Sequence, residues 1–201
     1  MSRLLLVRHG NTKSNSAERF WGQTDVELSA LGTKQAERLR DWLTNEKIDA
    51  VYTSDLRRAS ATAEIIASRH NLSVVICPEL HEISFGDVEG LTFKEIGQLY
   101  PELVKSWFNR RLDFRYPGGE SMAELNNRVV KFLDRLEKHA SEETILVVAH
   151  SGVLRLLICN LLGMELKHWR KLRTDLASLS IVETYPQGAI LNLLNDVSHL
   201  K

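Results

Sequence analysis

Arginine and histidine side chains occur in a pattern that suits the transfer of a phosphoryl group. Arg8 and His9 are adjacent near the start of the chain, and Arg58 and His150 stand in later polar segments. An arginine side chain presents a planar fork of donors that matches the oxygens of a phosphate group. Guanidinium groups beside an imidazole disfavour its protonated form, and the neutral ring can then attack phosphorus. The pattern therefore predicts phosphoryl transfer, with His9 as the attacking group.

A leaving alkoxide must be protonated, and Glu82 is the candidate general acid. Burial and a neighbouring phosphate dianion would both raise the pKa of its carboxyl group, which favours the protonated form. The sequence contains no histidine triad, no cysteine cluster and no aspartate cluster with the spacing of metal ligands. We therefore expect a site without a metal ion or other cofactor, in which the protein's own cations stabilise the transferred charge.

Short apolar runs alternate with helical patterns along the chain. Strands are predicted over residues 3–7, 48–53, 72–77 and 144–149, and two later strands over 177–184 and 189–194. Helices are predicted over 29–45 with Ser29 as N-cap, over 55–69, at about 92, from 121 to about 140, and over 153–163. Capping boxes, Thr92 with Glu95 and Ser121 with Glu124, mark the starts of two of these helices. The two late strands, joined by a turn at 186–188, are expected at the sheet edge.

This alternation predicts an α/β fold of three layers, with a mostly parallel central sheet and helices on both faces. One domain over residues 1–201 is the simplest count for a chain of this length, with a helical cap segment at about 92–120. Active sites of such sheets lie at the carboxyl ends of the strands. The segments Arg8-His9, Ser54 to Arg58 and His150-Ser151 all follow predicted strand ends, so we expect them to meet in one crevice.

Six short motifs along the chain carry a resemblance to a known family. They are VRHGNTKSN (7–15), GQTDVELSALGTKQA (22–36), SDLRRASATA (54–63), LHEISFGDVEG (80–90), PGGES (117–121) and VVAHSG (147–152). In this order they resemble the signatures of the histidine phosphatase superfamily, in its phosphoglycerate mutase-like branch. One departure is Val88, which stands where the family often has tryptophan and predicts weaker packing near the loop that carries Glu82.

The resemblance implies a role for each residue of the site. His9 would carry the phosphoryl group as a phosphohistidine, and Glu82 would protonate the leaving group and later activate water. Gln23 would lie near the substrate, and Arg57 would point toward solvent. The residues implied to bind the phosphoryl oxygens are Arg8, Asn15, Arg58 and His150.

Three functions stay open from the sequence. The first is a metal-independent phosphatase. The second is a phosphoglycerate mutase, which tends to have a longer lid that excludes water, whereas the span from Gly90 to His150 is short and mostly helical. The E-x-x-F-G-x-x-E-G pattern of the acid loop also looks like the phosphatase branch. The third is a non-catalytic module that binds a phosphorylated ligand, which the intact set of site residues disfavours.

The expected substrate is a small phosphorylated metabolite, with alpha-ribazole 5'-phosphate as the leading candidate. Specificity is expected in the cap segment, whose aromatic and cationic side chains can stack on a ring, hold a second anion or merely pack a cap. These side chains are Tyr100, Trp107, Phe108, Arg110, Arg111, Phe114, Arg115 and Tyr116.

Charge and hydropathy restrict the partners. Lys plus Arg equals Asp plus Glu, 26 each, which argues against a general nucleic-acid binder. No stretch approaches the roughly 20 apolar residues that span a bilayer, and the N-terminus lacks the features of a signal peptide. We therefore expect no membrane partner and a cytoplasmic location. Cys77 and Cys159 are expected to be buried free thiols. The basic cluster 167–173 is expected to form a solvated amphipathic helix. The family resemblance implies a homodimer.

Overall fold

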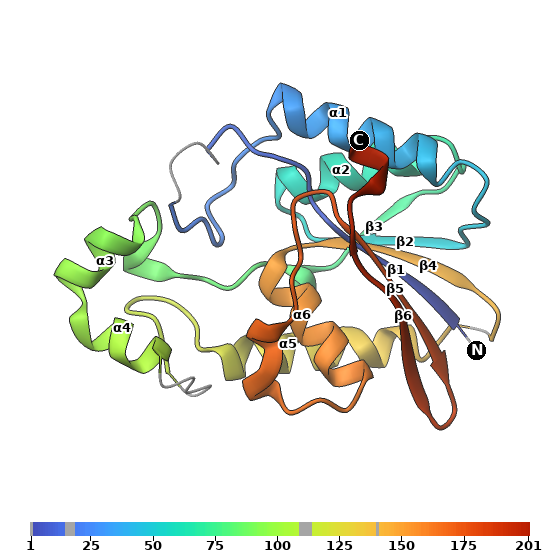
Figure 1. Cartoon of the computed structure of the whole chain (residues 1–201). Helices are drawn as coiled ribbons and strands as arrows, with labels where there is room; N and C mark the ends of the chain where they lie inside the picture. Colours follow the sequence, from blue (N-terminus) through green and yellow to red (C-terminus); the bar gives the residue numbers. More distant parts are fainter. Residues whose placement is uncertain (1, 15–18, 109–113, 140) are drawn as a thin grey trace.

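The computed structural model describes residues 2–14, 19–108, 114–139 and 141–201, and within these residues six strands form one sheet. The strands are β1 (Ser2–Arg8), β2 (Ala50–Thr53), β3 (Val74–Ile76), β4 (Thr144–Ala149), β5 (Leu179–Tyr185) and β6 (Gly188–Asp196). Their order across the sheet is β3-β2-β4-β1-β5-β6 (Figure 1). The first four strands are parallel to one another, and β5 is antiparallel to both of its neighbours, β1 and β6. The predicted mostly parallel α/β sheet is confirmed.

One sequence-based expectation about the sheet was wrong. Both late strands were expected at the sheet edge, but only β6 lies there. Strand β5 pairs with β1 from Ser2 to Val7 on one side and with β6 on the other. Strand order depends on these non-local pairings, which hydrophobic periodicity within a segment does not contain.

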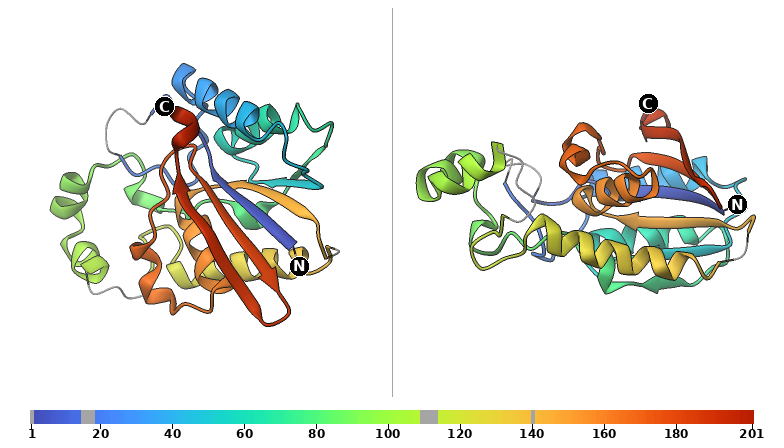
Figure 2. Two further views of the ribbon diagram at one scale, coloured as in Figure 1. Left: turned by 45° about the vertical axis from the view of Figure 1, so that its right-hand side comes forward. Right: turned by 90° about the horizontal axis from the view of Figure 1, so that it is seen from below.

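Helices cover both faces of the sheet (Figure 1, Figure 2). Helices α1 (Ala30–Trp42) and α2 (Arg57–Ala67) lie on one face, and α5 (Met122–Leu136) and α6 (Ser151–Leu161) lie on the other. Successive side chains of a strand point to opposite faces. Accordingly Leu4 and Leu6 of β1 join the core under α5 and α6, whereas Leu5 and Val7 join the core under α1 and α2. The run from residue 4 to 7 is therefore apolar at every position.

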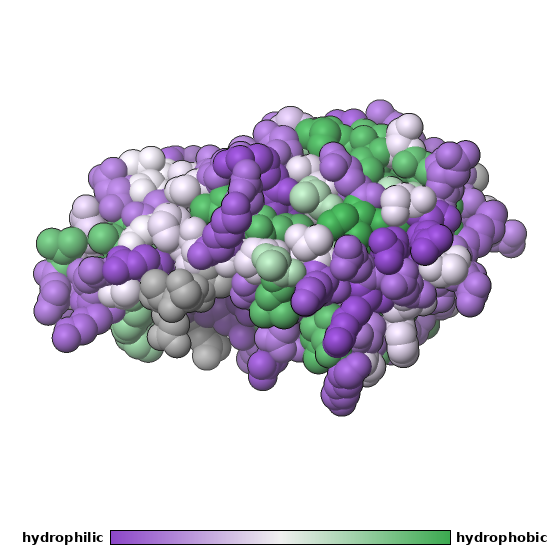
Figure 3. All heavy atoms as spheres, turned by 90° about the horizontal axis from the view of Figure 1, so that it is seen from above, coloured by the Kyte–Doolittle hydropathy of each residue, from purple (hydrophilic) through white to green (hydrophobic). Residues whose placement is uncertain are grey.

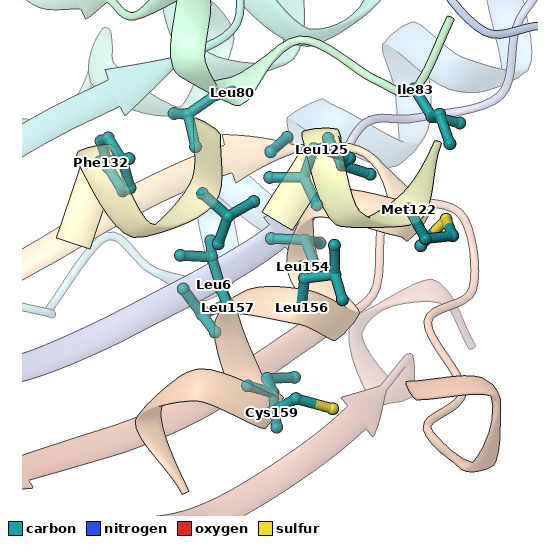
Figure 4. Close-up of a cluster of buried hydrophobic side chains, with 14 of the residues drawn as sticks. Leu6, Leu80, Ile83, Met122, Leu125, Phe132, Leu154, Leu156, Leu157 and Cys159 are labelled. Carbon is teal, nitrogen blue, oxygen red and sulfur yellow. The ribbon is translucent and has the colours of Figure 1, made fainter. Parts of the chain in front are cut away.

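The core between the sheet and α5–α6 is one continuous cluster of buried side chains. Leu6 of β1 lies among side chains from α5 and α6, including Leu125 and Leu154 (Figure 4). Val88, where weaker packing was expected, is fully buried within the same cluster. On the face that carries α1, hydrophilic side chains cover much of the surface and leave smaller hydrophobic patches between them (Figure 3).

Two short helices, α3 (Phe93–Leu99) and α4 (Pro101–Phe108), project beyond one end of the sheet (Figure 1). They lie within the segment predicted as a cap. The capping boxes predicted for α3 and α5 are both formed, and Ser29 caps α1 as predicted. The cap residues Arg110 and Arg111 lie outside the described residues.

Short 3-10 helices complete the fold: η2 (Pro78–Leu80), η3 (Gly86–Val88), η4 (Leu166–Lys171) and η5 (Ser198–Leu200). The amphipathic helix expected over 167–173 is a 3-10 helix, and Trp169 packs against the core from it. Across the described ranges, no helix combines the length and the apolar character needed to cross a bilayer.

Candidate active site

The ends of two neighbouring parallel strands bring the two predicted histidines together. Arg8 ends β1 and lies opposite Ala149, which ends β4, so His9 and His150 follow at the same edge of the sheet. The backbone N–H of His9 donates to the carbonyl of Ala149 at 3.1 Å. The centroids of the two imidazole rings are 5.1 Å apart, with planes inclined by 57°.

The ring of His9 is held in one orientation by its own loop. Its Nδ1 lies 2.8 Å from the carbonyl oxygen of Gly10. A carbonyl oxygen only accepts, so Nδ1 carries the proton and Nε2 keeps its lone pair. Gly10 is packed closely against the start of α1, because a Cβ there would lie 2.6 Å from the carbonyl oxygen of Gly32. The hydroxyl of Thr62 accepts a hydrogen bond from the Gly10 N–H at 3.2 Å, which ties this loop to α2.

Two arginines approach the histidines from different elements. Arg58, in the first turn of α2, is 2% exposed, and it donates to the carbonyls of Gly22 at 2.6 Å and Thr24 at 2.9 Å. Arg8 donates from Nη1 to the carbonyl of Thr174 at 2.7 Å, while its buried Nε has no hydrogen-bond partner among the described residues. Part of each guanidinium thus serves to fix the side chain, and donors remain for an anion.

Burial and positive charge keep both rings neutral. Burial, followed by the charges of Arg8 and Arg58, holds the pKa of His9 well below its ordinary value. Burial and the charge of Arg58 do the same for the pKa of His150. Burial also lowers the pKa of Arg8, to about 10, which leaves this side chain charged at neutral pH. Neither ring nitrogen of His150 has a hydrogen-bond partner in the part of the chain that the structure describes. This arrangement of neutral rings and guanidinium groups can accept an anion.

Glu82 reaches the site from the loop after η2, and its side chain is held by two backbone N–H groups. Its Oε2 accepts from Gly152 in the first turn of α6 at 3.1 Å, and its Oε1 accepts from Ile83 at 3.0 Å. Gly152 allows this approach because a Cβ there would lie 2.5 Å from Oε1 of Glu82. Gln23 donates from Nε2 to the backbone carbonyl of Glu82 at 3.1 Å, so it stands beside the candidate acid.

Two other residues, Arg57 and Asn15, were given positions in the sequence analysis. Arg57 is more than half exposed and pairs with Asp25 and Glu27, in agreement with the prediction that it points toward solvent. Asn15 lies outside the described residues. No group of three or more His, Cys, Asp or Glu side chains is arranged to hold a metal ion within the described ranges.

Two residues near the site were not singled out from the sequence. Thr174 accepts from Arg8 through its carbonyl, and its hydroxyl lies 2.8 Å from that of Ser151. Arg155 lies on α6, close enough to Glu82 and Arg8 for their charges to affect one another. Arg155 did give a signal, because it is the one charge in the otherwise apolar stretch 153–159. Thr174 gave none, because its contacts depend on how η4 docks.

A cavity of about 540 Å³ adjoins Glu82, and we call it the aromatic cavity. It lies between the cap helices and α6, and its lining includes Phe20, Phe93, Trp107, Trp169, Arg155 and Arg170, with Ser151 and Gly152 beside Glu82. A second cavity of about 560 Å³ lies near the start of β1 and contains none of the predicted site residues. Of these two cavities, the aromatic cavity adjoins the site.

Comparisons with known proteins agree with this geometry. The profile of the histidine phosphatase superfamily (branch 1) matches residues 4–197. Phosphoserine phosphatase 1 of Hydrogenobacter thermophilus is 34% identical over 200 residues, which cover 100% of this chain and 95% of that protein. The adenosylcobalamin/alpha-ribazole phosphatase of Escherichia coli (strain K12) is 35% identical over 193 residues, 96% of this chain and 95% of that protein. The crystal structure of the alpha-ribazole phosphatase from Shigella flexneri is 35% identical and covers 96% of both chains, with a TM-score of 0.88. The chain therefore belongs to the histidine phosphatase superfamily, and the prediction of a phosphatase of that superfamily is confirmed.

Proposed function

We propose that this protein hydrolyses small phosphomonoesters through a phosphohistidine formed at Nε2 of His9, without a metal ion. The observation that carries the proposal is the hydrogen bond from Nδ1 of His9 to Gly10, which leaves Nε2 unprotonated beside Arg8, Arg58 and His150. A neutral nucleophile among fixed cations suits an attack on a charged phosphoryl group.

In the first step, Nε2 of His9 forms a bond to phosphorus while the bond from phosphorus to the ester oxygen breaks. The guanidinium groups of Arg8 and Arg58 and the ring of His150 would contact the phosphoryl oxygens, with Asn15 as a further proposed ligand. The carboxyl group of Glu82 would give its proton to the departing oxygen, which leaves as an alcohol.

In the second step, water attacks the phosphohistidine. The carboxylate of Glu82 takes a proton from the water, an oxygen–phosphorus bond forms and the phosphorus–nitrogen bond of His9 breaks. Inorganic phosphate leaves, and both His9 and Glu82 return to their starting forms. Splitting the displacement into two steps in this way is covalent catalysis.

The natural substrate is proposed as a small phosphorylated metabolite, handled in the cytoplasm. The two relatives named above act, by their names, on phosphoserine and on adenosylcobalamin or alpha-ribazole phosphates, at 34% and 35% identity. Sequence identity to these two relatives therefore does not distinguish between their substrates. Alpha-ribazole 5'-phosphate is the first candidate to test, and Gln23 is proposed to lie beside it because it contacts the carbonyl of Glu82.

Hydrolysis of para-nitrophenyl phosphate in excess chelator tests the proposal. We expect turnover to persist in the chelator, to vanish in His9→Ala, and to be unchanged in His70→Ala, whose histidine lies after α2 and away from the site. Quenching of the wild-type protein in alkaline detergent during turnover of ³²P-labelled substrate should trap label on His9 that is stable in base and lost in acid. Retained turnover in His9→Ala would refute the mechanism.

A second assay, with phosphoglycerates as substrates, separates hydrolysis from phosphoryl transfer. A phosphoglycerate mutase would interconvert phosphoglycerates and release little inorganic phosphate, whereas the proposed phosphatase releases phosphate and leaves the isomers unchanged. A non-catalytic module would bind inorganic phosphate and turn over neither substrate.

A further inference from the structure

We propose that the aromatic cavity selects substrates whose leaving group is a flat apolar ring that bears an anionic group, and that Arg155 binds this anion. The inference rests on the proposed function, since it concerns the part of the substrate that departs from phosphorus. It adds a substrate class and a specificity residue that lies outside the proposed phosphate-binding set.

The state of Arg155 is the first observation. Its side chain is partly buried on α6, and its buried Nε has no hydrogen-bond partner among the described residues. Its guanidinium group lies over the ring of Trp169, whose centroid is 5.6 Å from the guanidinium carbon. Burial lowers the pKa of Arg155, while the charge of Glu82 favours the charged form. A buried donor without a hydrogen-bond partner is costly, which favours a ligand that supplies an acceptor.

The charges that line the cavity are the second observation. They belong to Glu82, Arg155 and Arg170 within the described residues. In the proposed reaction Glu82 gives its proton to the departing oxygen, and the guanidinium group of Arg155 lines the cavity beside it. The guanidinium group of Arg155 is therefore placed to attract an anionic group on the leaving part of the substrate.

Arg170 and two indole rings hold this wall of the cavity in place. The guanidinium carbon of Arg170 lies 5.2 Å from the ring centroid of Trp169 and 5.6 Å from that of Trp107, and its Nη1 donates to the Trp107 carbonyl at 2.6 Å. Trp107 belongs to α4 and Trp169 to η4, so Arg170 connects the cap to the body of the protein. Trp169 also lies against Arg155, and this contact holds the guanidinium group of Arg155 in place beside the cavity.

The aromatic walls indicate the shape of the group that would lie between them. Phe93 and Trp107 are stacked, with centroids 5.7 Å apart and planes inclined by 13°. Phe20 lies 5.0 Å from Trp107 between centroids. Aromatic side chains bind flat rings through offset or edge contacts. A cavity of about 540 Å³ is in the size range of sites for ring-bearing ligands.

A matched series of aryl phosphates tests this inference. The substrates are phenyl phosphate, 3-carboxyphenyl phosphate and 4-carboxyphenyl phosphate, with the methyl esters of the last two as neutral controls of similar size. The variants are Arg155→Gln, which removes the charge, and Arg155→Lys, which keeps it. Arg38→Gln removes an exposed charge on α1, remote from the cavity, and serves as the control.

We expect the wild-type protein to prefer at least one carboxylated substrate over its methyl ester. Arg155→Gln should lower kcat/KM for that substrate by about tenfold to a hundredfold, the range expected for a hydrogen bond between charged groups. It should change kcat/KM for phenyl phosphate by less than about threefold, and Arg155→Lys should retain part of the preference. Arg38→Gln should behave as wild type.

Two results would overturn the inference. One is an equal loss for the carboxylated and neutral substrates in Arg155→Gln, which would place Arg155 on the phosphoryl group or in packing. The other is a wild-type protein that prefers the methyl esters. If Arg155→Gln does not fold, Arg155→Lys is compared with wild type instead. The quantity compared is the ratio of kcat/KM for the carboxylated substrate to kcat/KM for its methyl ester.

Failure of the proposed function gives a separate result. In that case the wild-type protein would not hydrolyse phenyl phosphate at all. Calorimetric binding of 3- and 4-hydroxybenzoate, compared with their methyl esters, then tests the anion site without turnover. Weaker binding of the two acids to Arg155→Gln than to wild type supports the inference, and equal binding refutes it.

Discussion

The imidazole rings of His9 and His150 lie together just after the ends of two neighbouring parallel strands, 5.1 Å apart between centroids and inclined by 57°. Both rings are buried, and both have their pKa held well below the ordinary value, first by burial and then by the charges of nearby groups, Arg58 among them. The pair is thus a neutral element within a cationic pocket. This relationship has consequences for stability as well as for the proposed chemistry.

The free energy of unfolding of the phosphate-free protein should fall as the pH falls below roughly 6.5, the ordinary pKa of histidine. The unfolded chain then takes up protons on both rings, while the folded protein does not, so acid favours unfolding. Each ring contributes up to about 1.4 kcal/mol per pH unit until the pH reaches its lowered pKa in the folded protein. Urea unfolding at pH 7, 6 and 5 measures this slope. His150→Gln should have a smaller slope, and an unchanged slope would mean that His150 is protonated in the folded protein.

Arg58 and its neighbour Arg57 provide a matched pair of variants. Arg58→Lys should lower kcat/KM for para-nitrophenyl phosphate by about a hundredfold, because an ammonium group cannot bridge the carbonyls of Gly22 and Thr24 and also face the phosphoryl group. Arg57→Lys should stay within about threefold of wild type, since its partners Asp25 and Glu27 are exposed. Steady-state kinetics with thermal unfolding as a control measures both. Equal losses would contradict the assignment of Arg58 to the phosphate pocket.

Glu82→Gln should slow the release of poor leaving groups far more than that of good ones. An alkyl phosphate needs a proton on its departing oxygen, whereas para-nitrophenolate leaves without one. The ratio of kcat for β-glycerophosphate to kcat for para-nitrophenyl phosphate should therefore drop by at least about tenfold. Glu79→Gln is the control, because the half-buried carboxylate of Glu79 pairs with Arg135. Equal slowing of both substrates in Glu82→Gln would remove Glu82 from the role of acid.

Much of this site was predictable because its residues follow buried strands. The run 144–149 predicts a strand with the same bounds as β4, because it is mostly apolar and polar residues flank it. In the structure every residue of β4 is buried. The positions of His9 and His150 at one sheet edge then followed from parallel pairing. The motif register, not the local pattern, distinguished Glu82 from Glu79 and Glu89 as the residue at the site.

The parts that could not be predicted depend on contacts between distant segments. Thr174 holds Arg8 across 166 residues of sequence, and Arg155 faces a cavity whose other walls come from Phe20, Trp107 and Trp169. The ends of helices were also less predictable: α5 was expected to reach about residue 140 but ends at Leu136, and α1 was expected to reach 45 but ends at Trp42. Glu137 follows α5, and the capping residue Leu43 follows α1. Both residue types are compatible with a helix or a turn.

Gly152 gives the sharpest test of how Glu82 is placed. A Cβ at this position would lie 2.5 Å from Oε1 of Glu82, so Gly152→Ala must push the carboxyl group away from the first turn of α6. We expect a loss of about 1–3 kcal/mol in the free energy of unfolding, as for other overpacked sites. Gly97→Ala on α3 is the control, because a Cβ there meets no atom within 4 Å, and it should be neutral or stabilising by up to about 1 kcal/mol.

The kinetic signature of Gly152→Ala distinguishes a displaced acid from a general disturbance of the fold. If the carboxyl group has moved, this variant should share the leaving-group dependence of Glu82→Gln, with β-glycerophosphate slowed at least about tenfold more than para-nitrophenyl phosphate. The backbone N–H of Gly152 also donates to Oε2 of Glu82, so both contacts of the carboxyl group with α6 change together. Equal slowing of the two substrates, together with lower stability, would mean that the substitution acts on the packing of α6 and not on the acid.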